Sequence, residues 1–221
     1  MSPIGREAAP DTALALVDLR GPRPGPTVAL VAGVHGGKRA AVRALEQLAA
    51  ELPGQLVAGR VLLLPAANPA ALGSGLAQLS PLDSLNLNRV FPGRADGRPT
   101  ERLAHRILRD VVAPADLLVD LHGSDGEEMV GAFAYAARPG LDPRVDSAAR
   151  ALAEQWGTPR IVWDTEGPRT LATSRFLQTA AHLSGVPAIT VFEAGTTSDD
   201  PAATAAFVRG ARRLLAAQGL I

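Results

Sequence analysis

The sequence contains no cysteine, and this absence removes several kinds of chemistry at once. Disulfide bonds, zinc sites built on thiolates and cysteine nucleophiles are all excluded. Histidine, aspartate and glutamate remain as side chains that could hold a metal ion. We therefore expect any metal centre in this protein to use imidazole and carboxylate ligands.

The chain also lacks a net charge and a long apolar run. Lys and Arg total 22, and Asp and Glu total 22, so there is no overall field to attract nucleic acid or an anionic membrane. No apolar run approaches the ~20 residues that a membrane helix needs, and residues 1–7 lack the apolar segment of a secretory signal. We expect a cytoplasmic protein with neither nucleic acid nor membrane as a partner.

What the chain does contain is enough apolar material for one large core. It has 221 residues, of which 47% are hydrophobic, and about one domain is the natural expectation for that length. No internal repeat or linker divides it. We predict a single domain over residues 1–221.

The pattern of apolar residues indicates an α/β fold. Apolar runs predict strands at 13–19, 27–34, 60–64, 117–121, 130–137, 161–163 and 187–192. Helical spacing predicts helices over 42–52, 100–111, 142–156, 173–183 and 200–215, with Thr100, Asp142 and Asp200 at their starts. The first two strands, joined by the Pro- and Gly-rich residues 21–26, suggest a hairpin, whereas the strand–helix–strand order that follows favours parallel pairing.

Residues 66–98 form a long segment with little periodicity. A loop much longer than ~12 to 15 residues is usually functional or disordered. Its mixture of amides, a guanidinium and apolar anchors at 86–93 favours function.

Three polar residues stand directly after apolar strands: His35, His122 and Glu193. If those strands are parallel neighbours, the three side chains converge at the carboxyl edge of the sheet, where α/β proteins place ligands. Two neutral imidazoles suit zinc, and a nearby carboxylate can act as general base on a metal-bound water. Asp120 lies two residues before His122, so its carboxylate can orient the imidazole.

Four segments, at 33–36, 86–93, 120–123 and 186–193, occur in an order that resembles the succinylglutamate desuccinylase/aspartoacylase family of the zinc carboxypeptidase superfamily. The resemblance implies a zinc-carboxypeptidase-like α/β/α fold of three layers with a mixed, largely parallel sheet. It implies zinc on His35 and His122, a substrate carboxylate held by Asn88 and Arg89, and Glu193 as general base and proton shuttle. The reaction would be hydrolysis of the N-acyl amide of a small acidic substrate.

The chain departs from the family pattern at two side chains and at its end. Lys38 stands where the family has a glutamate ligand, three residues after the first histidine, and Gln78 falls where the family commonly has an arginine. Family members often carry a carboxyl-terminal β-domain, which we do not expect here. The entrance to the site would then be wider, or completed by a partner in a homo- or hetero-oligomer.

Lys38 is the departure with the largest energetic consequence. An ammonium about 4 Å from a divalent ion is repelled by ~8 kcal/mol at an effective dielectric near 20. Three arrangements are open: Lys38 extends to solvent, a carboxylate from Asp125, Glu127 or Glu128 replaces the missing ligand, or the ammonium occupies the metal position and binds an anion itself.

Two functions follow from these arrangements. The first is a zinc-dependent deacylase acting on a small acidic acyl amide. The second is a catalytically degenerate family member that binds a carboxylate or pairs with an active subunit, with Lys38 replacing the charge of the metal.

Overall fold

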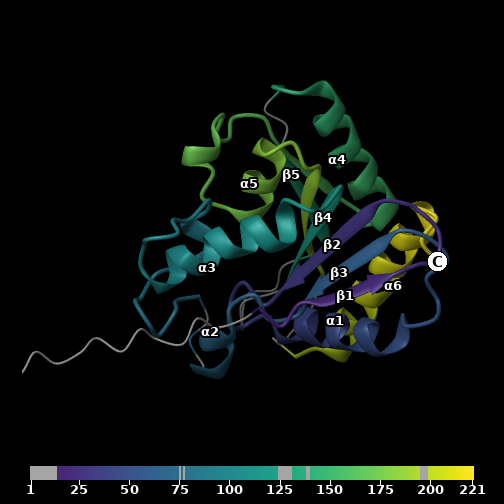
Figure 1. The fold of residues 1–221 in the computed structure, drawn as a ribbon, viewed down its shortest axis with the longest axis horizontal. Helices are drawn as coiled ribbons and strands as arrows, with labels where there is room; N and C mark the ends of the chain where they lie inside the picture. Colours follow the sequence, from purple (N-terminus) through teal and green to yellow (C-terminus); the bar gives the residue numbers. More distant parts are fainter. Residues whose placement is uncertain (1–13, 75, 77, 124–130, 138–139, 195–198) are drawn as a thin grey trace, which may run out of the picture.

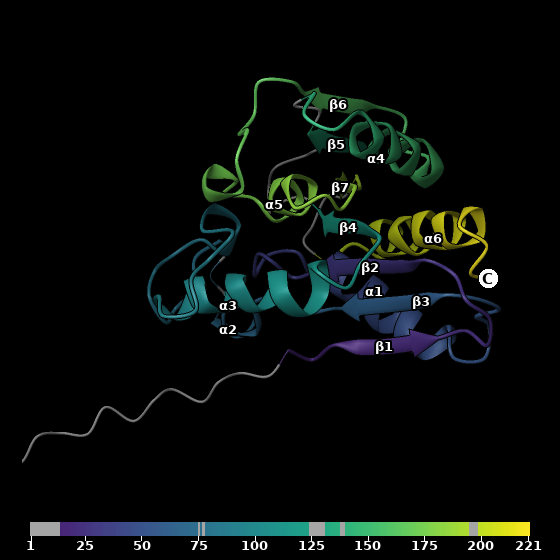
Figure 2. The ribbon, with the colours of Figure 1, turned by 45° about the horizontal axis from the view of Figure 1, so that its top comes forward.

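The computed structural model describes residues 14–74, 76, 78–123, 131–137, 140–194 and 199–221. Within them, seven strands form one sheet in the order β1-β3-β2-β4-β7-β5-β6, which can be followed from bottom to top in Figure 2. The strands are β1 (Val17–Arg20), β2 (Thr27–Ala32), β3 (Arg60–Leu64), β4 (Leu117–His122), β5 (Phe133–Ala137), β6 (Ile161–Asp164) and β7 (Ala188–Phe192).

The sheet is mixed and largely parallel. The strands β3, β2, β4 and β7 run parallel to one another, and β6 runs parallel to β5. The pairs β1–β3 and β5–β7 are antiparallel. The predicted α/β class with a mixed sheet is therefore confirmed.

Helices cover both faces of the sheet and complete three layers (Figure 1). On one face, α1 (Arg39–Glu51), α4 (Pro143–Trp156) and α6 (Pro201–Ala217) pack against alternate strand residues such as Val119 and Val191. On the other face, α3 (Pro99–Ile107), a π-helical turn (Leu108–Val112) and α5 (Leu177–Leu183) pack against the intervening residues such as Leu118 and Ala188. No helix in the described part of the chain is both long and apolar enough to cross a membrane.

The predicted hairpin of the first two strands is wrong, because β1 pairs with β3. Residues 21–26 lie against the turn that precedes β3, where the Gly21 N–H donates to the Gly59 carbonyl at 2.9 Å. A Cβ atom at Gly21 would lie 2.5 Å from the Ala58 nitrogen, so only glycine permits this approach. The connection therefore passes the start of β3 and delivers β2 to the far side of that strand.

The long segment 66–98 contains two short helical elements. Helix α2 (Pro69–Ser74) begins after Asn68, whose Oδ1 accepts from the Ala71 N–H at 3.3 Å, and a 3-10 turn spans Leu87–Arg89. The prediction of a segment without regular structure was wrong here, because six residues give too short a pattern to detect by periodicity.

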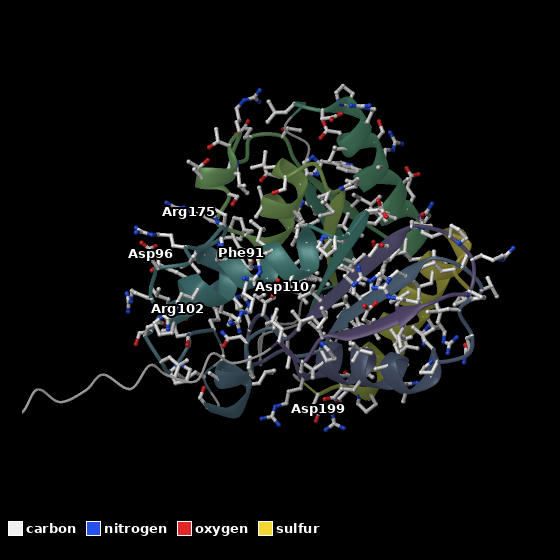
Figure 3. The ribbon with its side chains drawn as sticks, in the orientation of Figure 1. Phe91, Asp96, Arg102, Asp110, Arg175 and Asp199 are labelled. Atoms are coloured by element: carbon white, nitrogen blue, oxygen red, sulfur yellow. The ribbon has the colours of Figure 1, made fainter. Side chains whose placement is uncertain are left out.

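The predicted helix starts at Asp142 and Asp200 are confirmed, and two others need correction. The N-cap of α3 is Arg98, since Thr100 lies inside the first turn and its hydroxyl donates to Asp83 Oδ1 at 2.6 Å. Helix α5 begins at Leu177 because Leu171–Thr173 forms a separate 3-10 turn. The chain between these elements pairs with the long segment through a bridge between Phe91 and Arg175, which are both labelled in Figure 3.

Candidate functional site

The candidate site lies at the carboxyl edge of three adjacent parallel strands. In the register of the sheet, Ala32 of β2 pairs with Leu121 of β4, and His122 of β4 pairs with Phe192 of β7. The three strands therefore end together, and His35, His122 and Glu193 follow at the same edge, as the sequence predicts. The common strand edge is confirmed, but the predicted convergence of all three side chains is wrong for Glu193, whose carboxylate contacts Trp156 of α4. The roles of the three residues stay predictions.

His122 is held by the carboxylate that the sequence identified. Its Nε2 lies 2.9 Å from Asp120 Oδ2, and both side chains are buried. The carboxylate favours the tautomer in which Nε2 carries the proton and donates. Nδ1 is then the acceptor nitrogen of the His122 ring.

His35 lies beside His122 and is held in a similar way by an amide. Its Nε2 lies 3.0 Å from Asn86 Oδ1, and the centroids of the two imidazole rings are 5.3 Å apart at an interplanar angle of 80°. The loop that carries His35 requires glycine on both sides. Gly33 has φ of 69°, and a Cβ atom at Gly36 would lie 2.3 Å from the Leu76 carbonyl oxygen.

Asn86 is a site residue that the sequence analysis did not single out. Its Oδ1 also accepts from the Asn88 N–H at 2.8 Å, which caps the 3-10 turn Leu87–Arg89. The signal was Asn86 itself, because an asparagine side chain commonly accepts from the backbone N–H two residues later in the chain. Gln78 reaches the same amide, with its Oε1 3.5 Å from Asn86 Nδ2.

Lys38 does not extend to solvent. The side chain is buried with 5% of its surface exposed, and its ammonium donates to the carbonyl of Gly123, the residue after His122. Of the three arrangements open to Lys38, the exposed one is therefore wrong. The four-carbon stem is long enough to cross from the start of α1 to the end of β4, and the carbonyl there supplies an acceptor for the ammonium.

The carboxylate of Glu193 turns to the opposite face of the sheet from His122. Val191 packs on the face of α1, α4 and α6, and Glu193, two residues later, accepts a hydrogen bond from Trp156 Nε1 of α4 at 3.1 Å. Burial raises the pKa of Glu193, and the hydrogen bond from Trp156 and the charge of Arg209 oppose that rise.

Trp156, the last residue of α4, is buried in the core, and its indole N–H gives it a second role. Gly210 of α6 makes room for the indole, because a Cβ atom there would lie 2.4 Å from Trp156 Cε2. No local sequence signal marks this contact, since it joins residues from α4, α6 and the end of β7.

The predicted substrate-binding residues Asn88 and Arg89 lie near this edge but make structural contacts. Asn88 Oδ1 accepts from the Leu177 N–H at 2.9 Å and so joins the long segment to α5. Arg89 is exposed, donates to the Asn88 carbonyl at 2.7 Å, and places its guanidinium 4.8 Å from the centroid of the Phe176 ring. Their binding of a substrate carboxylate stays a prediction.

The described residues supply only part of a zinc site. The two imidazoles suit zinc, because the hydrogen bonds at Nε2 leave Nδ1 as the nitrogen with acceptor character. Residue 38, however, is a buried lysine, and its ammonium donates to the carbonyl of Gly123, the residue after His122. Among the described residues, no cluster of three or more His, Asp or Glu side chains could hold a metal ion. Asp125, Glu127 and Glu128 lie outside the described residues. The described side chains therefore do not fit zinc as they stand.

Comparison with known proteins agrees with the fold. Residues 24–217 match the succinylglutamate desuccinylase/aspartoacylase catalytic domain. The chain is 32% identical over 199 residues to the N-alpha-acetyl-L-2,4-diaminobutyric acid deacetylase of Halomonas elongata, which covers 89% of this chain and 56% of that protein. The chain thus spans little more than half the length of this relative.

Solved structures give the same result. The product-bound structure of the ectoine utilization protein EutE (DoeB) from Ruegeria pomeroyi superposes with a TM-score of 0.81 at 31% identity, covering 93% of this chain and 61% of that one. A succinylglutamate desuccinylase/aspartoacylase from Rhodobacter sphaeroides gives a TM-score of 0.80 at 26% identity, with coverage of 93% and 59%. A metallo-carboxypeptidase from Pseudomonas aeruginosa shares the fold, with a TM-score of 0.68 at 19% identity and coverage of 91% and 60%.

Proposed function

Because the chain belongs to the succinylglutamate desuccinylase/aspartoacylase family, we propose that it acts on the acyl amide of a small N-acyl amino acid and hydrolyses it. The main support for the proposal is that β2, β4 and β7 end at the same edge of the sheet. His35, His122 and Glu193 lie at the ends of these three parallel strands. The 32% identity to a deacetylase supports the same reaction class.

Hydrolysis of an amide needs a proton acceptor for the attacking water and a proton donor for the leaving amine. Glu193 suits both steps, because burial raises the pKa of its carboxyl group toward the range in which it can take up and return a proton. Its carboxylate must first exchange the Trp156 N–H for water, which requires a rotation of the Glu193 side chain.

The reaction also needs hydrogen-bond donors or a positive group beside the acyl carbonyl oxygen, where the oxyanion forms when water attacks the carbon. Lys38 brings a buried ammonium to the strand edge, next to Gly123. Arg89 and Asn88 remain our candidates for binding the carboxylate of the substrate. Zinc on His35 and His122 would need a third ligand, for which Asp125, Glu127 and Glu128 are the candidates, so the test includes metal analysis of the purified protein.

The experiment is a hydrolysis assay that follows acetate release from N-acetyl-L-2,4-diaminobutyrate and N-acetylglycine by NMR, with and without added zinc. We expect turnover by the wild-type protein and a loss of at least about 10²-fold in Glu193→Gln, the usual contribution of a general base. Glu154→Gln is the matched control, since Glu154 is an exposed residue of α4 that pairs with Arg150. Equal acetate release in the wild type and in buffer, under both zinc conditions, would overturn the proposal.

A further inference from the structure

We propose that Lys38 makes the His35–His122 edge a metal-independent binding site for a small carboxylate, with the ammonium in the place of a metal ion. This inference deepens the proposed function, because it names the charge of the ligand and the group that receives it. It rests on the proposed function only for the location of the site.

The burial of Lys38 is the first observation. A buried ammonium is costly unless hydrogen-bond acceptors or an opposite charge compensate it. The Gly123 carbonyl accepts a hydrogen bond from this ammonium, and Gly123 directly follows the buried His122. The chain therefore builds a cation into this edge and does not leave it on the surface.

The charge that Lys38 brings gives a second, electrostatic argument. A zinc ion with one carboxylate ligand carries a single positive charge in total, and an ammonium carries the same charge. Zinc in addition to Lys38 would place three positive charges together, at a cost of ~8 kcal/mol for a separation of about 4 Å. The site therefore suits an ammonium or a zinc–carboxylate unit, and this sequence has the ammonium.

The position of Lys38 at the start of α1 is the third observation. Lys38 is the N-cap residue of a helix of 13 residues that has no acidic residue in its first turn. The positive end of the helix dipole lies at the backbone of Lys38, and the ammonium lies at the far end of the same side chain, beside Gly123. Both contributions are positive, and a carboxylate is the anion that acyl amino acids and free acids share.

The experiment compares N-acetylglycine with its neutral amide, N-acetylglycinamide, by calorimetry on full-length protein that has been treated with EDTA. We expect the wild type to bind N-acetylglycine at least about tenfold more tightly than the amide, a difference of ~1.4 kcal/mol. Lys38→Gln should lose this preference, and Lys38→Arg should retain part of it. Arg39→Gln is the matched control, because it removes the same charge from the adjacent exposed position and should change nothing.

Zinc titration supplies a second readout that does not depend on ligand binding. The wild type should bind no zinc at micromolar concentration, and Lys38→Glu should bind one zinc ion per chain. If Lys38→Gln fails to fold, as judged by circular dichroism, the wild-type and Lys38→Glu titrations decide the matter alone. Stoichiometric zinc in the wild type, or an undiminished carboxylate preference in a folded Lys38→Gln, would overturn the inference.

The two proposals fail in different ways. Zinc-dependent hydrolysis by the wild type would refute the metal-independent site and leave deacylation standing. Carboxylate binding without hydrolysis of either N-acetyl substrate would refute deacylation and leave the Lys38 site standing.

Discussion

Two buried histidine–aspartate pairs occur in the described part of this molecule, and only one of them lies at the candidate site. His122 Nε2 is 2.9 Å from Asp120 Oδ2 at the carboxyl edge of the sheet. His182 Nε2 is 2.8 Å from Asp146 Oδ1, where it joins α5 to the first turn of α4. The exposure of the four side chains is similarly low, so burial and distance do not separate the two pairs.

Their surroundings do separate them. The His122 ring faces a second imidazole, and the ammonium of Lys38 donates to the carbonyl that follows it. Asp146 instead uses its second oxygen to accept from the Gly140 N–H at 3.0 Å, so both of its oxygens hold the fold together. The two His–Asp pairs in this molecule therefore differ in the groups around them and not in their own geometry.

The largest effect on stability should come from His182→Ala. Removing the imidazole leaves the buried Asp146 Oδ1 without its hydrogen-bond partner and opens a cavity, and we expect a loss of about 3 kcal/mol in the free energy of unfolding. Urea denaturation measures this loss. Binding of N-acetylglycine by the remaining folded protein should not change, and a weakened affinity would show that this pair also belongs to the site. Glu154→Gln, at an exposed ion pair, should cost less than about 0.5 kcal/mol.

Asp120→Asn should distinguish the two His–Asp pairs most clearly, because it should change ligand affinity as well as stability. The asparagine oxygen can still accept from His122 Nε2, so we expect a smaller loss of about 2 kcal/mol in stability. Because the substitution replaces a carboxyl group by a neutral amide three residues before Gly123, whose carbonyl accepts from Lys38, the affinity for N-acetylglycine should rise by about fivefold, which is ~1 kcal/mol. Calorimetry on the metal-free variant measures this change. A weaker affinity would mean that Asp120 acts through the orientation of His122 and not through its charge.

Asn86→Ala tests whether the amide orients His35 as the carboxylate orients His122. The variant loses the acceptor for His35 Nε2 and for the Asn88 N–H, so we expect a loss of about 1.5 kcal/mol in stability. The ¹⁵N chemical shifts of the His35 ring should show a change in tautomer, while those of His122 stay as in the wild type. Unchanged His35 shifts would show that another group fixes its tautomer.

The sequence predicted the backbone of the site better than its side-chain contacts. The apolar runs before His35, His122 and Glu193 identified three strands, and their parallel pairing follows from the helices that connect them. The link from Asp120 to His122 was also predictable, because residues two apart in a strand share a face.

Contacts between distant segments were beyond prediction. The position of β1 beside β3 depends on how closely Gly21 approaches Ala58, and periodicity contains no information on that approach. The pairing of Asn86 with His35 spans 51 residues, and that of Trp156 with Glu193 spans 37. Such contacts are set by the packing of whole elements, whereas the composition of each segment determines only its own structure.

Trp156→Phe tests the third buried carboxylate, Glu193, whose partner is an indole and not an imidazole. Burial raises the pKa of Glu193 and the Trp156 N–H lowers it, so the variant should raise that pKa further, and we expect a loss of about 1 kcal/mol in stability. A raised carboxyl pKa in the folded state contributes stability below the ordinary glutamate value of about 4.3 and loses it as the pH rises through the folded-state pKa. In the variant this loss should therefore extend to higher pH than in the wild type.

Carboxyl ¹³C NMR measures the pKa of Glu193, and urea denaturation across pH 4 to 8 measures how stability depends on pH. The difference in pH dependence between the wild type and Trp156→Phe should vanish in a Glu193→Gln background, because residue 193 then carries no charge. A pH dependence that persists in that background would assign it to another group and leave the indole with a packing role alone.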